Sequence, residues 1–128
     1  MPTEVELLRE LVACPSVSGT EEAIAQLVES IAMGWGLDVV RDDTGVKIVA
    51  ETGRPGRNLA FLSHLDVVPP GEGWTRDPFT PTIEGHLLYG RGSGDAKASV
   101  AAMLLAARDL AEQLPNDIGG ALMVVLGL

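Results

Sequence analysis

An apolar run, Leu59-Ala60-Phe61-Leu62-Ser63, is followed at once by His64 and, two positions later, by Asp66. An almost unbroken apolar run of this length predicts a strand covered on both faces, so we expect it to be the central strand of a sheet. Side chains of an extended chain alternate between faces with period two, so His64 and Asp66 leave the same side of the strand's carboxyl end. The sequence therefore directs an imidazole and a carboxylate toward one place.

A second carboxylate lies in a glycine-rich turn, Gly90-Arg91-Gly92-Ser93-Gly94-Asp95, just ahead of a long apolar helix. The glycines allow backbone conformations that can present Asp95 inward. Imidazole nitrogen and carboxylate oxygen are donors that zinc takes, and a carboxylate can bridge two metal ions. We therefore predict that His64 and Asp95 are metal ligands. Asp66 is suited to support them, by accepting the ring N–H or by orienting a catalytic group.

Two helices are predicted before the apolar strand. Thr3 and Glu6 form a capping-box pattern, which predicts a short helix to about Val12. A second helix follows a break, with Ser18 or Thr20 as its N-cap and an apolar stripe on one side. A third helix, which opens at Lys97 or Ala98, is predicted to run to about residue 113.

The remaining segments predict strands. Residues 37–41 and 46–51 are short β-branched runs joined by turn residues, and residues 82–89 resemble a second, smaller hairpin. Residues 121–126 form another apolar strand. Helices and strands alternate broadly with hairpins among them, so the predicted fold class is α/β, with a mixed sheet sandwiched between helices.

Composition excludes several classes of function. The chain has 128 residues, enough for one domain, and its net charge of −9 argues against a nucleic-acid partner, which would need clustered Lys and Arg. Its single cysteine, Cys14, cannot form an internal disulfide and is expected to be a small buried side chain. The apolar run 98–107 is half the ~20 residues that a membrane span needs. Without a signal-peptide pattern, the expected location is cytoplasmic.

Other readings of the polar residues are weaker. The turn at residues 90–95 has Asp95 where a dinucleotide fingerprint needs its third glycine, and a carboxylate there would repel phosphate. Ser63 and Ser93 lack the nucleophile-elbow pattern of a serine hydrolase. His64-x-Asp66 can also be an incidental polar strand end, and the glycine-rich segment an ordinary turn.

Five further side chains are expected to have structural or surface roles. Arg91 and Lys97 are predicted to be solvated charges or members of salt bridges, with contact to substrate or to carboxylates around the metal as the alternative. His86 is predicted to be exposed at a hairpin tip. Trp74 and Phe79 are predicted to pin the Pro- and Gly-rich loop that contains them by being buried.

Several motifs in order resemble the zinc-dependent aminoacylase and carboxypeptidase family. They are Ser63–Pro69, Gly73–Trp74, Asp77–Phe79 and Leu88–Lys97. The family includes acetylornithine deacetylase, succinyl-diaminopimelate desuccinylase and glutamate carboxypeptidases. The resemblance implies hydrolysis of the amide bond of a small N-acyl amino acid, two zinc ions in a complete active site with cobalt as a possible substitute, and a homodimer formed through a separate domain.

The resemblance also assigns roles to single residues. His64 would bind one metal ion, Asp95 would bridge two, and Asp66 would be the catalytic aspartate behind His64. It further implies a cis peptide bond between Asp95 and Ala96.

The resemblance covers only the start of the family's catalytic domain. The family's general-base glutamate and an adjacent ligand would follow the strand at residues 121–126, and Leu128 is the last residue of the sequence. We therefore expect residues 1–128 to be the N-terminal portion of the catalytic domain, without the dimerisation domain and with little turnover as this fragment, because the proton acceptor is missing. The alternatives are a truncated or degenerate non-catalytic product and a dipeptidase or carboxypeptidase of the same family.

Overall fold

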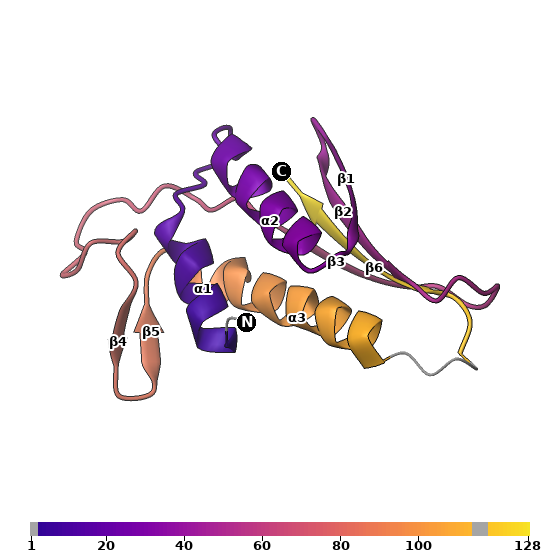
Figure 1. Ribbon diagram of the computed structural model, residues 1–128. Coiled ribbons are helices and arrows are strands. Elements are labelled where there is room, and N and C mark those ends of the chain that lie inside the picture. The colour runs from indigo at the N-terminus through magenta and orange to yellow at the C-terminus, as the bar shows by residue number, and fades with distance from the viewer. Residues whose placement is uncertain (1–2, 114–117) are drawn as a thin grey trace.

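A computed structural model describes residues 3–113 and 118–128 (Figure 1). In chain order, the described elements are α1 (Glu4–Ala13), α2 (Glu22–Gly34), β1 (Asp38–Asp42), β2 (Gly45–Glu51), β3 (Leu59–His64), β4 (Thr82–Glu84), β5 (Leu87–Tyr89), α3 (Ala98–Gln113) and β6 (Ala121–Gly127). The three predicted helices, both hairpins and both apolar strands are therefore confirmed.

Four strands form one mixed sheet in the order β1-β2-β6-β3. β1 pairs with β2 and β2 with β6 in antiparallel register, whereas β3 runs parallel to β6, with Leu59 beside Leu122 and His64 beside Gly127. The parallel pair brings the carboxyl end of β3 to the same edge as the end of β6. The fold class, α/β with a mixed sheet, is as predicted.

The position of β3 differs from the prediction. It lies at the edge of the described sheet, and Leu59 and Leu62 are 56% and 71% exposed. The inner position next to it is taken by β6, in which Leu122, Val124 and Leu126 are buried. An apolar run indicates that both faces of a strand avoid water, but it does not determine the order of the strands. The prediction of a central strand was wrong for the described residues.

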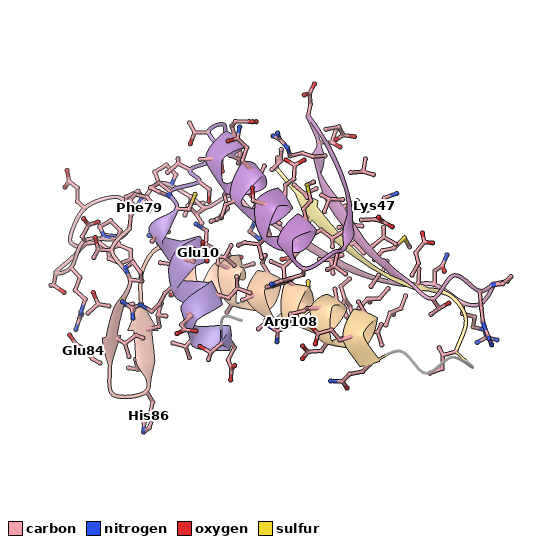
Figure 2. The ribbon with its side chains drawn as sticks, in the orientation of Figure 1. Glu10, Lys47, Phe79, Glu84, His86 and Arg108 are labelled. Atoms are coloured by element: carbon pink, nitrogen blue, oxygen red, sulfur yellow. The ribbon has the colours of Figure 1, made fainter. Side chains whose placement is uncertain are left out.

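Helices pack on one face of the sheet, and the core lies between them (Figure 1). α2 packs on β1 and β2, and α3 packs on β2, β6 and β3. Strand β2 alternates accordingly, with Val46, Ile48 and Ala50 buried and Lys47 exposed on the other face, where it points away from the helices (Figure 2). Within residues 3–113 and 118–128 no second helical layer covers the opposite face, so the predicted enclosure of the sheet between helices is seen on one side only. No helix within these ranges is long and apolar enough to cross a membrane.

The N-terminal cap of α1 agrees with the prediction from the local sequence, whereas that of α2 does not. The capping box of α1 is formed, with the Thr3 amide donating to Glu6 and the Glu6 amide donating to the Thr3 hydroxyl. Neither Ser18 nor Thr20 caps α2, which begins after Glu21 without a side-chain cap. The Thr20 hydroxyl donates to the carbonyl of Val17 instead, and Ser18 turns toward a distant segment described below.

The loop between β3 and β4 is held differently from the prediction. Trp74 is 36% exposed, and its indole N–H donates to the carbonyl of Pro70 at 2.8 Å. Phe79 is half-buried. The loop is therefore fixed by a hydrogen bond as well as by partial aromatic burial.

Candidate metal centre

His64 and Asp66 meet at the carboxyl end of β3, on the same side as predicted. The Nδ1 atom of His64 lies 3.0 Å from Oδ1 of Asp66 and 3.1 Å from the Asp66 carbonyl oxygen. Both partners are acceptors, so Nδ1 makes these hydrogen bonds in the tautomer that carries its proton there. This bond orients the imidazole so that Nε2 faces away from Asp66.

Asp95 comes to the other side of the same imidazole. Its Oδ1 atom lies 3.1 Å from Nε2 of His64, although the two residues are 31 positions apart. Asp95 belongs to the turn Ser93–Lys97, whose backbone leaves the helical conformation at Asp95 (φ −130°, ψ 96°) and Ala96. The peptide bond between Asp95 and Ala96 is cis, as the resemblance implied.

A glycine is required at the entry to this turn. Gly92 has φ of +87°, and a Cβ atom there would lie 2.6 Å from Cγ1 of Val67. Only glycine adopts this conformation freely and fits the space. The close approach of Gly92 to Val67 brings the turn that carries Asp95 against the segment that carries Asp66.

These residues line one open cleft of about 340 Å³. Its lining consists of His64, Asp66, Val67, Val68 and residues 90–95. The His64 side chain is 44% exposed and the Asp95 side chain 89% exposed, so a dissolved ion can reach both. All three residues singled out from the sequence therefore share one cleft.

The cleft favours positive charge at His64. Desolvation alone would lower the pKa of His64, but the hydrogen bonds to Asp66 and Asp95 and the charge of Asp66 outweigh it and raise that pKa. The pKa of Asp66 is lowered, chiefly by a hydrogen bond from Ser18 and also by His64, against desolvation. The same negative surroundings that hold a proton on His64 would favour a cation.

The spacing of the two donors suits a zinc ion. Two ligands that bind one tetrahedral zinc at ~2.1 Å lie ~3.4 Å apart, and the His64 nitrogen and the Asp95 oxygen are separated by 3.1 Å. Asp66 lies behind the imidazole, where a partner of the second ring nitrogen belongs. No group of three or more potential metal-binding side chains occurs within residues 3–113 and 118–128. The described residues therefore fit as two ligands and a supporting carboxylate.

Comparison with known proteins decides the family. The model of peptidase family M20/M25/M40 matches residues 60–126, more than half of the chain. The chain belongs to this family. Proteins named succinyl-diaminopimelate desuccinylase are similar to it. The protein of Rhizorhabdus wittichii is 41% identical, and the match covers 84% of this chain and 30% of that protein. The protein of Cereibacter sphaeroides is 42% identical, and the match covers 99% of this chain and 35% of that protein.

A solved structure gives the same result for the fold. The M20 metallo-carboxypeptidase Sso-CP2 of Sulfolobus solfataricus matches with a TM-score of 0.77 and 26% identity, over 98% of this chain and 30% of that one. The chain thus spans about a third of the M20 proteins that it matches.

The sequence prediction missed Lys97 of this M20 chain. Lys97 is fully buried, and its ammonium donates to the carbonyls of Leu11 at 2.9 Å and Cys14 at 2.8 Å. It is not solvated, and among residues 3–113 and 118–128 its ammonium pairs with carbonyls and not with a carboxylate, so the predicted surface role was wrong. Burial lowers the pKa of Lys97 to about 8. Its place at the start of an apolar helix was the only sign of burial in the sequence.

Ser18 was also misassigned. The sequence offered it as a helix cap, but its hydroxyl donates to Oδ2 of Asp66, 48 positions away. A serine three positions before an acidic pair resembles an N-cap, and the sequence contains no sign of the distant partner. The structure therefore adds a fourth side chain to the hydrogen-bonded series that runs through Asp66 and His64 to Asp95.

The remaining polar residues lie outside this series. Arg91 is half-buried, donates to the Pro70 carbonyl at 3.2 Å and lies 5.1 Å from the ring centre of Trp74, so it is not a freely solvated charge. His86 is exposed at the tip of the hairpin β4–β5, as predicted (Figure 2). Cys14 is half-buried, and burial raises the pKa of its thiol.

Proposed function

We propose that residues 1–128 are the N-terminal part of the catalytic domain of a dinuclear metal-dependent amidohydrolase. In this proposal His64 binds one metal ion, Asp95 bridges two, and Asp66 holds His64. The observation that carries it is the approach of Nε2 of His64 and Oδ1 of Asp95 to 3.1 Å, with Asp66 on the opposite side of the ring.

Each side chain has a defined task in this proposal. Asp66 accepts a hydrogen bond from the Nδ1–H group of His64, and the lone pair on Nε2 then faces the cleft. Asp95 offers two carboxylate oxygens from a fixed turn, and its high exposure leaves both open to ligands. Zinc, or cobalt in its place, would supply the Lewis acidity that polarises an amide carbonyl and acidifies water.

The proposed substrate is a small N-acyl amino acid. Two relatives that are 41% and 42% identical are named succinyl-diaminopimelate desuccinylase, which supports an N-succinyl amino acid over the N-acetyl substrate of an acetylornithine deacetylase or the peptide of a dipeptidase or carboxypeptidase. This chain spans about a third of those relatives. We propose that the region corresponding to the other two-thirds supplies the general base, the remaining metal ligands and a homodimer interface.

A chimera tests this proposal. Residues 1–128 would replace the matching N-terminal third of the Cereibacter sphaeroides desuccinylase, which is 42% identical over 99% of this chain. We expect zinc-dependent hydrolysis of an N-succinyl amino acid, with the N-acetyl analogue cleaved more slowly. His64→Ala and Asp95→Asn should each reduce kcat/KM by at least ~100-fold, and the matched control His86→Ala should leave it unchanged.

The result that contradicts the proposal is also clear. If a folded, dimeric chimera retains its rate after His64→Ala or Asp95→Asn, these residues do not hold the catalytic metal. Equal cleavage of N-succinyl and N-acetyl substrates would overturn the substrate preference while leaving the metal assignment in place.

A further inference from the structure

The connector between α1 and α2, residues 14–21, lies alongside the segment that carries Asp66. The Ser18 amide donates to the Val67 carbonyl at 3.0 Å, and the Val67 amide donates to the Ser16 carbonyl at 2.9 Å. The Ser16 hydroxyl, which is buried, donates to the carbonyl of Leu65 at 2.7 Å. Asp66 is therefore flanked on both sides by hydrogen bonds to the connector.

The Ser18 side chain adds a bond to Asp66 itself. Its hydroxyl donates to Oδ2 of Asp66, whereas Oδ1 of the same carboxylate accepts from His64. The alternative acceptor for this single proton, the Val67 carbonyl, is farther away at 3.4 Å. Each oxygen of the Asp66 carboxylate thus has its own donor.

This second donor matters because Asp66 and His64 are both partly open to water. Their side chains are 31% and 44% exposed. The terminal torsion of an aspartate is broad, so a carboxylate held at one oxygen can rotate and exchange its partner for water. A donor on the other oxygen removes that freedom.

The opposite side of the imidazole makes this orientation important. The acceptor near Nε2 is also a carboxylate, that of Asp95, so a neutral imidazole has two competing places for its one proton. If the proton moves to Nε2, the lone pair faces Asp66 instead of the cleft. On the Nδ1 side there are two acceptors: the Asp66 carbonyl oxygen at 3.1 Å, which the backbone fixes, and the Asp66 carboxylate at 3.0 Å, which a side-chain torsion can move. The position of this carboxylate is therefore the variable part of the balance between the two tautomers.

We propose that Ser18 is a positioning residue, whose hydroxyl fixes the Asp66 carboxylate so that His64 keeps its proton on Nδ1 and presents Nε2 to the cleft. The metal-binding consequence rests on the proposed function, but the choice of tautomer does not. Ser18 acts through Asp66 and does not touch a reacting atom.

The test is ¹⁵N NMR of the two imidazoles in this chain, recorded in alkaline solution. His86, which is exposed at the hairpin tip, is the internal reference. We expect the wild-type His64 to show a protonated Nδ1 and the Ser18→Ala variant to shift toward the His86 pattern. Thr20→Val, which removes the neighbouring connector hydroxyl that donates to Val17, should leave His64 unchanged.

A second pair keeps the test valid if Ser18→Ala does not fold. Ser18→Thr keeps the hydroxyl, and Ser18→Val introduces a side chain of nearly the same shape as threonine without a hydroxyl. We therefore expect only Ser18→Thr to retain the wild-type tautomer. Addition of zinc should perturb Nε2 of His64, with an affinity about tenfold lower for the variants without a hydroxyl. An unchanged His64 tautomer in both Ser18→Ala and Ser18→Val would overturn the proposal. If zinc leaves the wild-type signals unchanged, His64 and Asp95 do not bind zinc without the ligands proposed to lie outside this chain, and the tautomers still decide the role of Ser18.

Discussion

The two halves of the candidate metal centre are built by different means. His64 and Asp66 extend from a strand end, where the alternation of side chains places them on one side, and their surroundings bury more than half of each side chain. Asp95 extends from a non-helical turn and is 89% exposed. The strand half is positioned by backbone periodicity, and the turn half depends on tertiary contacts made by its neighbours, above all Lys97 and Gly92.

The connector between α1 and α2 supports both halves. Ser18 donates to Asp66 on the strand side, and the Cys14 carbonyl accepts from Lys97, two positions after Asp95. We therefore expect this loop, although far from the site in sequence, to affect its geometry. It also indicates how to disturb one half without the other.

The largest effect on the turn half is expected from Lys97→Ala. The substitution removes the donor of two backbone carbonyls and leaves a cavity among buried side chains, so we expect a loss of about 3 kcal/mol in the free energy of unfolding. Urea denaturation measures it. Lys47→Ala, on the exposed face of β2, is the matched control and should change stability by less than ~0.5 kcal/mol. Equal small effects would show that the buried ammonium does not hold the turn.

The pH dependence of stability examines the same contact. The pKa of Lys97 is about 8 in the folded chain, below its ordinary value of 10.5, so the unfolded state binds more protons between these values and stability rises with pH in that window. We expect the wild type to gain up to ~3 kcal/mol relative to Lys97→Met from pH 8 to pH 10.5. Urea midpoints across this range provide the measurement, and parallel curves for the two proteins would rule out the lowered pKa.

A smaller effect is expected at the entry to the turn. Gly92→Ala introduces a side chain at φ of +87° and brings its Cβ to 2.6 Å from Val67, which should cost about 2 kcal/mol. Gly94→Ala, in the same turn, has ordinary φ and nothing within 4 Å, so it is the matched control. Thermal unfolding of both variants would separate them. A comparable loss in both would mean that the whole turn, rather than the approach of Gly92 to Val67, sets the geometry.

The strand half could be predicted from sequence because its information is local. The apolar run and the spacing of His64 and Asp66 were enough to place both side chains in one cleft. The edge position of β3 could not be predicted, since the order of strands depends on β6, which lies about sixty residues later in the chain.

The turn half shows the limit in another way. Asp95 was identified by its setting and by the family motif, but the burial of Lys97 and the bond from Ser18 depend on partners 83 and 48 positions away. A lysine at a helix start resembles a surface charge, and a serine before acidic residues resembles a cap. Both local interpretations are chemically sound, but in each case the residue makes a tertiary hydrogen bond that the local sequence does not indicate.

The central claim is that His64 and Asp95 share a cation. Diffraction at the zinc absorption edge, on zinc-soaked crystals of the chimera, which supplies the remaining proposed ligands, tests it most directly. We predict an anomalous peak ~2.0–2.2 Å from Nε2 of His64 and from a carboxylate oxygen of Asp95. A zinc peak at the exposed His86 with none between His64 and Asp95 would contradict the account.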